Sequence, residues 1–231
     1  ISINVESMYI SKIKIKGFRN FKEKEILFND GINVIIGHNN AGKSNVLKAM
    51  SLAIDTQSSK RLDVHDFNKH TTIDELKANP PKVSINLTIS QSKDEDPNSD
   101  DLVTVGNYLI KLASPYEALI TYEFFLPENE RQKYIDALSE VDNTKKAWKV
   151  IQHDFLRLYT SRIWGGDPTL QVQADSESLQ KFDFQFLDAI RDVERDMFSG
   201  RNTLLREVLD FFMDYNIKMM QLKAQKPKLQ K

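Results

Sequence analysis

Residues 37–44 match the pattern GxxxxGK[ST] without a mismatch, and the match ends in Lys43 and Ser44. The apolar, β-branched run Ile32–Ile36 comes directly before it and predicts a buried central strand. After it, the apolar residues of Asn45–Ile54 recur at helical spacing. A strand, a glycine-bearing loop and an amphipathic helix in this order predict an α/β fold built around a P-loop.

A loop of this kind binds phosphate for a simple physical reason. Its glycines allow conformations that turn successive N–H groups toward an anion, and the helix that follows adds free N–H groups and the positive end of its dipole. Lys43 supplies an ammonium for the β- and γ-phosphates, and the hydroxyl of Ser44 is a ligand for Mg²⁺. The sequence therefore predicts a site for ATP and Mg²⁺ at Gly37, His38, Asn39, Asn40, Ala41, Gly42, Lys43, Ser44 and Asn45.

The second half of such a site is not visible in the sequence. Phosphoryl transfer also needs an acid on another strand to hold the metal and a residue that positions water or an acceptor. An apolar run that ends in Asp-Glu usually supplies them. The nearest candidate, Phe184–Asp188, lacks the second acid, and Val208–Asp210 lies within a helical pattern. We therefore assign no catalytic residue and expect ATP binding with little or no hydrolysis.

The rest of the chain predicts further strands and helices. Strands are expected at Tyr9–Lys16, Glu25–Phe28, Lys82–Ser90, Ala118–Leu126 and Phe182–Leu187. Asn29–Gly31 is typical of a hairpin turn, and Gly165–Pro168 is a strong break. Residues 128–160 and 202–215 have helical patterns, and the acid-rich segment 91–101 is expected to be a solvated loop. We expect a mixed sheet that carries the P-loop helix, an adjoining antiparallel subsheet and a helical region from 128 onward.

Composition excludes several kinds of protein. The chain has no cysteine, which excludes disulfides, cysteine-ligated metals and thiol catalysis. Its net charge of −1 excludes a uniformly basic coat for nucleic acid. No apolar run approaches the roughly 18 residues of a membrane span, and no secretory signal is visible, so we expect a cytoplasmic protein. The four histidines are too scattered for a zinc motif, and core packing is expected for Trp148, Phe155, Tyr159 and Trp164.

The opening of the chain resembles a known group of proteins. The strand pattern Ile13–Lys16, the run Gly17-Phe18-Arg19-Asn20-Phe21, the hairpin and the P-loop resemble the N-terminal lobe of ABC-type ATPases of the SMC/RecF group. Within that group, Asn39–Ser44 and Phe186–Asp192 resemble the OLD (overcoming lysogenization defect) family. In that family an ATPase domain precedes a Toprim nuclease domain. Asn40 stands where the wider group has glycine, which favours OLD over SMC.

The resemblance implies roles for single residues. Asn39 takes the position of an asparagine that faces the γ-phosphate in these ATPases. Arg19 matches an arginine of the family that approaches the nucleotide. An exposed arginine at the end of the hairpin is an equally good interpretation of Arg19. The family's Q-loop glutamine belongs near 182–187, but Gln185 lies inside the strand pattern. The signature turn is absent, because Phe198–Gly200 is too short for it. The Asp-Glu pair, the switch histidine and the Toprim acids are absent too.

For the longer protein, the resemblance implies an ATPase and ATP-dependent endonuclease that dimerises around ATP and acts on DNA in phage defence or repair. Residues 1–7 are then an extension or expression-derived, 8–215 a partial ABC-type ATPase domain, and 216–231 a basic tail or linker into a missing C-terminal half. The first hairpin is rich in basic residues, which either bind DNA phosphates or form an exposed, solvated face. These residues are Lys12, Lys14, Lys16, Arg19, Lys22 and Lys24.

Three alternatives stay open. An SMC/RecF-like repair ATPase without a nuclease would continue into a long heptad repeat rather than a Toprim acid cluster. A small-molecule kinase would need a lid, for which Arg191, Arg195, Arg201 and Arg206 are the available arginines, but such kinases usually open with the P-loop strand itself. A pure interaction module with a relic P-loop would not bind ATP.

Overall fold

The computed structural model describes residues 8–56, 58–92 and 105–180. The described residues all belong to one compact unit, which lies within Ile1–Gln185. The strand predicted at Phe182–Leu187, the helix predicted over 202–215, the tail and nearly all of the acid-rich segment lie outside the described residues. Among those that are described, no helix is long and apolar enough to cross a membrane.

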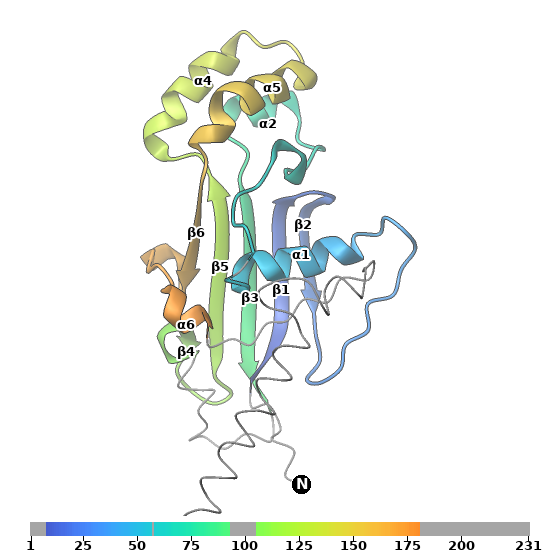
Figure 1. Ribbon diagram of the computed structural model, residues 1–231, viewed down its shortest axis with the longest axis vertical. Coiled ribbons are helices and arrows are strands. Elements are labelled where there is room, and N and C mark those ends of the chain that lie inside the picture. Colours follow the sequence, from blue (N-terminus) through green and yellow to red (C-terminus); the bar gives the residue numbers. More distant parts are fainter. Residues whose placement is uncertain (1–7, 57, 93–104, 181–231) are drawn as a thin grey trace, which may run out of the picture. The chain divides into compact units, whose positions relative to one another are not determined.

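This unit is built on a six-stranded sheet in the order β2-β1-β3-β5-β4, with β6 also paired to β5 (Figure 1). Every strand pair in the described residues is antiparallel. The strands are β1 (Met8–Phe18), β2 (Phe21–Leu27), β3 (Val83–Gln91), β4 (Leu109–Lys111), β5 (Glu117–Phe125) and β6 (Thr160–Gly165). The strands predicted at Tyr9–Lys16, Lys82–Ser90 and Ala118–Leu126 are confirmed to within a few residues, because alternating patterns mark half-buried strands.

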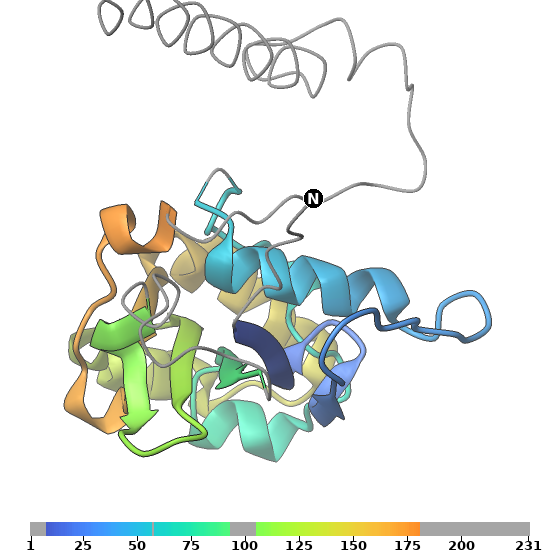
Figure 2. The ribbon, with the colours of Figure 1, turned by 90° about the horizontal axis from the view of Figure 1, so that it is seen from below.

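Helix α1 (Lys43–Ile54) lies across one face of this sheet (Figure 2). Ile13, Ile15, Ile85 and Leu87 are fully buried and are paired across β1 and β3, so they lie on the same face. The buried residues of α1 complete this layer of the core: Val46, Ala49, Met50, Leu52, Ala53 and Ile54. The predicted P-loop helix is therefore confirmed, and its apolar face holds it on the sheet.

A helical group covers the end of the sheet where β1 and β5 end and β3 begins (Figure 1). Its α-helices are α2 (Ile73–Ala78), α4 (Arg131–Ser139) and α5 (Thr144–Val150), and the π-helix Ile151–Phe155 continues α5. The other helical segments are Val64–Asp66, Gly106–Tyr108, Glu128–Glu130, Leu156–Leu158, Pro168–Leu170 and α6 (Ser176–Gln180). The helical pattern predicted over 128–160 is confirmed up to Leu158.

Aromatic rings join the helical group to the sheet. The ring of Phe67 lies 5.4 Å from Tyr159, 5.8 Å from Phe124 and 5.9 Å from Trp148. Phe155 and Tyr159 are 6% and 5% exposed. The core packing predicted for Trp148, Phe155 and Tyr159 is thus confirmed.

Two sequence predictions around the P-loop are wrong in this structure. Ile32–Ile36 is not a strand, and Ile32, Val34 and Ile36 are 95%, 76% and 89% exposed. No neighbouring strand in the described residues offers backbone partners to this segment. The hairpin turn also lies elsewhere: β1 turns into β2 at Arg19 and Asn20, whereas residues 28–42 form a long excursion beyond β2 (Figure 1).

Strands β4 and β6 were not predicted. Both pair with the same edge of β5, β4 at its start and β6 along the rest. β4 has only three residues, too few for a pattern to show, and in β6 (Thr160–Gly165) buried and exposed residues do not alternate. Their strand structure comes from the backbone of β5, which offers hydrogen-bond partners to whichever segment lies beside it.

Lys60 closes the C-terminal end of α1. Its Nζ donates hydrogen bonds to the carbonyl oxygens of Ser51, Leu52 and Asp55, at 3.1, 2.8 and 2.6 Å. These carbonyls belong to the last turn of the helix or its end, where partners within the helix are missing. Burial lowers the pKa of Lys60 to about 8, and Lys48 adds to this, although the charge of Asp55 opposes it.

Because of Lys60, the stability of the protein should depend on pH. Its pKa in the folded protein, about 8, lies below the ordinary value of 10.5. Between these two values the unfolded chain binds more protons, so the folded state gains stability as the pH rises from about 8 to about 10.5. We expect the free energy of unfolding of wild type, relative to Lys60→Met, to rise across this window in urea titrations. A Lys48→Met variant is the control. If the free energy of unfolding of wild type rose equally relative to Lys48→Met, Lys60 would not be the group responsible.

Candidate nucleotide-binding site

The P-loop turns into α1 through two residues in left-handed conformations. Asn40 has φ 66° and Gly42 has φ 100°. A Cβ on Gly42 would lie 2.4 Å from Nδ2 of Asn20 and 2.8 Å from Cζ of Phe21. Gly42 thus suits this position through its backbone angle, and a larger residue would also have to displace the side chains of Asn20 and Phe21. Asparagine is one of the few other residues that tolerate the left-handed region, which explains Asn40.

The side chain of Lys43 points back into the loop. Its Nζ donates to the carbonyl oxygens of Gly37 at 2.7 Å and His38 at 2.9 Å. The N–H of Ala41 donates to the same His38 carbonyl at 3.2 Å. The ammonium therefore lies at the concave side of Gly37–Ser44, where a phosphate held by the loop would meet it.

The N-terminal turn of α1 is suited to an anion. Its N-cap is Gly42, which brings no side-chain cap, and no acid occupies the first turn. The unpaired N–H groups and the positive end of the helix dipole are therefore not neutralised by the helix itself. Ser44 lies exposed in this turn, next to Lys43. A hydroxyl in this place is suited to a magnesium ion that bridges phosphates.

A chain of side-chain contacts ties the loop to the β1–β2 turn and to the segment before α2. Arg19 donates from Nε to Asp66 at 2.9 Å and from Nη1 to Oδ1 of Asn45 at 2.8 Å. Asn45 donates to Asn20 at 2.7 Å, and Asn20 donates to the Ala41 carbonyl at 3.4 Å. Arg19 itself is in the left-handed region, with φ 47°. The guanidinium is thus held beside the first turn of α1.

The structure places the sequence-predicted residues in one region. The nine residues Gly37–Asn45 are continuous, and Asn45 brings Arg19 to them. Asn20 and Asp66 were not predicted. Asp66 lies 47 residues from Arg19 in sequence, so no local pattern could have linked them. The one local signal was the capping box of the short helix Val64–Asp66, in which Asp66 accepts a bond from the N–H of Asp63.

We expect Asp66→Ala to destabilise the fold by about 1–3 kcal/mol. The substitution removes a half-buried ion pair with Arg19 and the bond to the N–H of Asp63. Urea unfolding measures the loss. Asp74→Ala is a matched control, because Asp74 is exposed in the first turn of α2, and its change should stay within about 0.5 kcal/mol. Equal effects of the two variants would contradict the role given to Asp66.

The basic residues of the hairpin do not form one patch. In the β1–β2 register Lys14 lies opposite Glu25 and Lys16 opposite Glu23, on one face, whereas Lys24 lies opposite the buried Ile15. Lys14 pairs with Glu23 at 2.8 Å and Lys22 with Glu75 at 2.7 Å. Acids therefore alternate with the lysines, because neighbouring strand residues point to opposite faces.

Several predicted features lie outside the described residues, namely Gln185, Asp188 and the Phe198–Gly200 turn. Within residues 8–56, 58–92 and 105–180, no group of three histidines, aspartates or glutamates is placed to hold a metal ion. The geometry described above brings together the loop Gly37–Ser44, the first turn of α1 and the guanidinium of Arg19.

Comparison with known proteins identifies the family. The model of a family described as an AAA domain matches residues 12–231. The chain belongs to this AAA domain family. The DNA replication and repair protein RecF of Acetivibrio thermocellus is 28% identical over 146 residues, which are 56% of this chain and 37% of that protein. The chromosome partition protein Smc of Halobacteriovorax marinus is 25% identical over 236 residues, or 95% of this chain and 18% of that protein.

Among solved structures, an SMC ATPase studied for ATP-driven dimerization and DNA-stimulated activation aligns with 87% of this chain and 96% of its own, at 18% identity and a TM-score of 0.44. This AAA domain is of the ABC-ATPase type, like RecF and SMC proteins, and the predicted fold class is confirmed. The chain spans only 37% to 44% of the length of four RecF relatives.

Proposed function

We propose that this chain is the ATP-binding N-terminal half of a RecF/SMC-type ATPase that acts on DNA. The observation that carries the proposal is the loop Gly37–Ser44, with the ammonium of Lys43 turned into it at the uncapped start of α1. An ammonium, free helix N–H groups and a left-handed glycine together form a site for a polyphosphate. The β1–β2 hairpin before the loop supports this proposal over a small-molecule kinase.

The residues present fit ATP and Mg²⁺. Lys43 would exchange the carbonyls of Gly37 and His38 for phosphate oxygens, and the first turn of α1 would donate N–H groups to the same phosphates. Ser44 would hold Mg²⁺, which when bound neutralises charge between the β- and γ-phosphates. Arg19 stands next to Asn45 as a further cation, in agreement with the role that the family resemblance gives it.

The exposure of Ile32, Val34 and Ile36 supports the proposal that this chain holds only part of the ATPase site. β-branched apolar side chains that are 76% to 95% exposed are a surface that proteins normally cover. We propose that the remainder of the longer protein covers this segment and brings the metal-holding acid and the general base. The chain alone should then bind ATP and hydrolyse it very slowly.

The partners of the longer protein follow from the same proposal. ATP held between two copies would favour a closed homodimer, because the γ-phosphate gives that state contacts that the open state lacks. DNA is the expected substrate, since the relatives named above act in DNA repair and chromosome partition.

The test is a titration of the chain with a fluorescent ATP analogue, with and without Mg²⁺, together with an assay of phosphate release. We expect saturable, Mg²⁺-enhanced binding and phosphate release near the background. Rapid hydrolysis by the chain alone would contradict the proposal that it holds only part of the ATPase site, and a lack of any binding would contradict the nucleotide site.

An OLD-type nuclease is the second candidate. It rests on Asn39–Ser44, in which Asn40 replaces a glycine of the wider group. Asn40 has φ 66°, a conformation that either residue tolerates, so the loop geometry fits both families. The relatives named above are RecF and SMC proteins, which favours a repair ATPase without a nuclease. ATP-stimulated nicking of a supercoiled plasmid by the longer protein would instead support the nuclease.

A further inference from the structure

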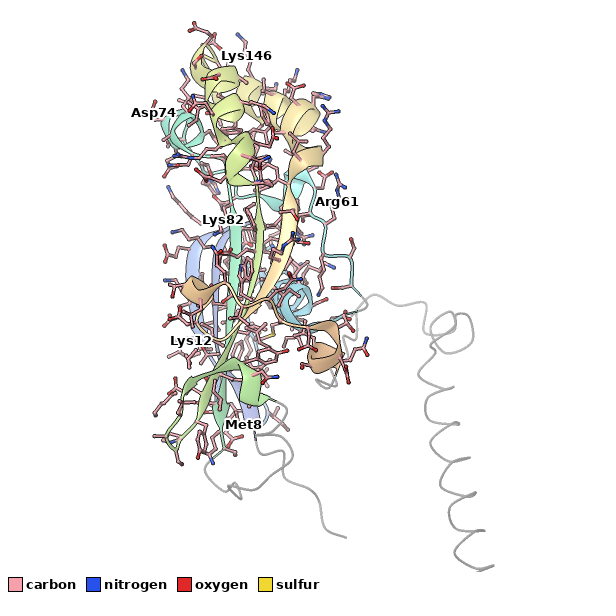
Figure 3. All side chains as sticks on the ribbon, turned by 90° about the vertical axis from the view of Figure 1, so that its left-hand side faces the viewer. Met8, Lys12, Arg61, Asp74, Lys82 and Lys146 are labelled. Carbon is pink, nitrogen blue, oxygen red and sulfur yellow. The ribbon has the colours of Figure 1, made fainter. Side chains whose placement is uncertain are left out.

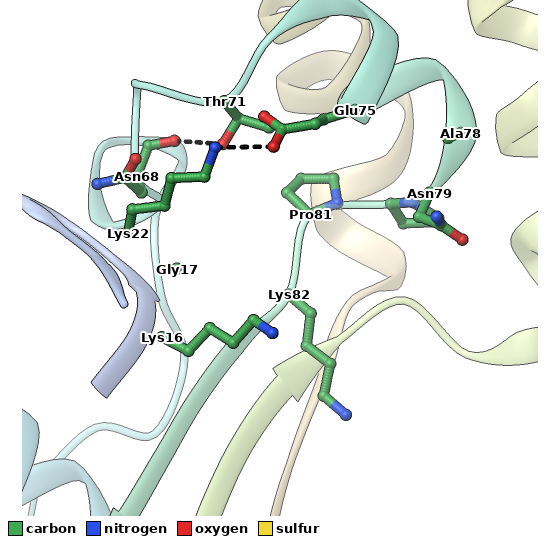
Figure 4. Close-up of a pocket in the computed structure, with 11 residues that line it drawn as sticks. Lys16, Gly17, Lys22, Asn68, Thr71, Glu75, Ala78, Asn79, Pro81 and Lys82 are labelled. Atoms are coloured by element: carbon green, nitrogen blue, oxygen red, sulfur yellow. Dashed lines mark hydrogen bonds and ion pairs between the residues drawn. The ribbon is translucent and has the colours of Figure 1, made fainter. Parts of the chain in front are cut away.

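A cavity lies beside the β1–β2 turn, next to Lys16, Gly17 and Lys22. It has a volume of about 330 Å³ and opens where the ends of β1 and β2 meet α2 and the start of β3 (Figure 4). It is lined by three lysines, one acid and several apolar or uncharged residues: Lys16, Lys22, Lys82, Glu75, Gly17, Asn68, Thr71, Ala78, Asn79, Pro80 and Pro81. None of the residues proposed to hold ATP lines it.

The walls of this cavity are rigid. A Cβ on Gly17 would lie 2.2 Å from the carbonyl oxygen of Lys82, so the two backbones touch there. Asn68 holds the adjoining part of the wall, because its N–H donates to the Gly17 carbonyl and its Nδ2 to the Arg19 carbonyl, both at 2.8 Å. Pro80 and Pro81 restrict the floor further. A ligand would therefore meet a preformed surface.

The lysines of the cavity are already arranged to hold carboxylates. Lys22 contacts Glu75 at 2.7 Å, and Lys82 contacts Glu123 at 2.6 Å (Figure 4 shows the first pair). Lys16 is different: its nearest paired acid is Glu23 at 3.9 Å, its side chain is 64% exposed, and it extends across the cavity. Its ammonium is thus available for an acid from outside.

We propose that this cavity docks an acidic peptide segment of a partner protein. Lys16 would take a carboxylate of the peptide, with Lys22 and Lys82 at either side, and the apolar floor of Ala78, Pro80 and Pro81 would take a neighbouring aliphatic or aromatic side chain. Charge complementarity selects the acidic partner, and the concave apolar floor adds contact area that a point charge alone would not use.

Nucleic acid fits this surface less well. A polyphosphate backbone needs a stripe of one charge sign, because its affinity comes from neutralising many phosphates at once. Here lysines alternate with Glu23, Glu75 and Glu123 around the opening. Figure 3 shows Lys82 between α2, marked by Asp74, and the lower part of the sheet, marked by Lys12. Carboxylates on flexible peptide side chains can exchange one at a time with the acids of such a mixed surface, whereas the closely spaced phosphates of a nucleic acid would lie against all of them.

The test uses the whole chain and a short fluorescein-labelled polyglutamate peptide, followed by fluorescence anisotropy at low and high salt. Polyglutamine is the uncharged control and oligothymidylate is the nucleic-acid arm. Lys16→Glu should weaken polyglutamate binding by about tenfold. Lys24→Glu makes the same charge change on the same hairpin but lies opposite Ile15, away from the cavity, and should weaken it less than about twofold.

Folding of each variant is checked by circular dichroism, and Lys22→Ala serves as a second cavity variant. The Lys43→Ala variant should bind polyglutamate like wild type, since the docking proposal does not depend on ATP. Three results would overturn the proposal. Polyglutamine could bind as well as polyglutamate, or Lys16→Glu and Lys24→Glu could weaken polyglutamate binding equally. The third is binding of oligothymidylate, in place of polyglutamate, that depends on Lys16.

Discussion

Replacing Lys43 with alanine should weaken binding of a fluorescent ATP analogue by about tenfold to a hundredfold. Charge-assisted hydrogen bonds to phosphate are worth roughly twice a neutral bond, and Lys43 makes two bonds to loop carbonyls that phosphate oxygens would replace. Binding is measured by fluorescence titration in the presence of Mg²⁺.

Lys48→Ala is the matched control for this measurement. Lys48 lies on the same helix as Lys43 but outside the loop, so the variant has the same charge change and should bind nearly as wild type. Lys43→Arg should recover little affinity, because the planar guanidinium does not fit the place of a compact ammonium. If Lys43→Ala and Lys48→Ala bind the analogue equally, the P-loop is not the nucleotide site.

Gly17→Ala should lower the free energy of unfolding by about 3 kcal/mol or more. Gly17 has φ +72°, and a non-glycine residue pays roughly 1–2 kcal/mol for the left-handed region. In addition, the new Cβ would lie 2.2 Å from the Lys82 carbonyl oxygen, a backbone atom that cannot rotate away. The end of β1 would have to separate from the start of β3, where the sheet core begins. Urea unfolding and the midpoint of thermal unfolding measure the loss.

Gly31→Ala separates the cost of the left-handed backbone from the cost of the close contact with Lys82. Gly31 has φ +88°, a similar backbone strain, but a Cβ there would meet no atom within 4 Å. Its loss should therefore stay near 1 kcal/mol, the cost of the left-handed conformation alone. A loss at position 31 as large as that at position 17 would show that backbone strain, and not the contact with Lys82, sets the effect.

The fold could be predicted where local patterns and tertiary contacts agree. In β3 buried and less buried residues alternate over most of Val83–Gln91, so its pattern marks both its existence and its inner face. The hairpin turn was misplaced because Asn29–Gly31 carries stronger turn residues than Arg19-Asn20. The actual turn depends on Asn68 and Asp66, whose backbone and side-chain bonds hold Arg19 in the left-handed region.

In the segment Ile32–Ile36 the local pattern and the tertiary contacts disagree. Its composition is that of a buried strand, yet it remains exposed and unpaired in the described part of the molecule. A strand needs a neighbour to satisfy its N–H and C=O groups, and β-propensity alone does not supply one. Under the proposal that this chain is part of a longer protein, we expect this segment to become a strand only when the remainder of that protein provides the neighbour.

The position of the P-loop could be predicted from the sequence alone, because a P-loop is a continuous segment whose glycines, lysine and serine act through local backbone geometry. The α/β class and the main strands could be predicted too, through their periodicity. The contacts of Arg19 with Asp66 and Asn45 are visible only in the folded chain. The same is true of the cavity that Lys16, Lys22 and Lys82 line together. These residues are far apart in sequence, and chain topology alone brings distant side chains within hydrogen-bonding distance.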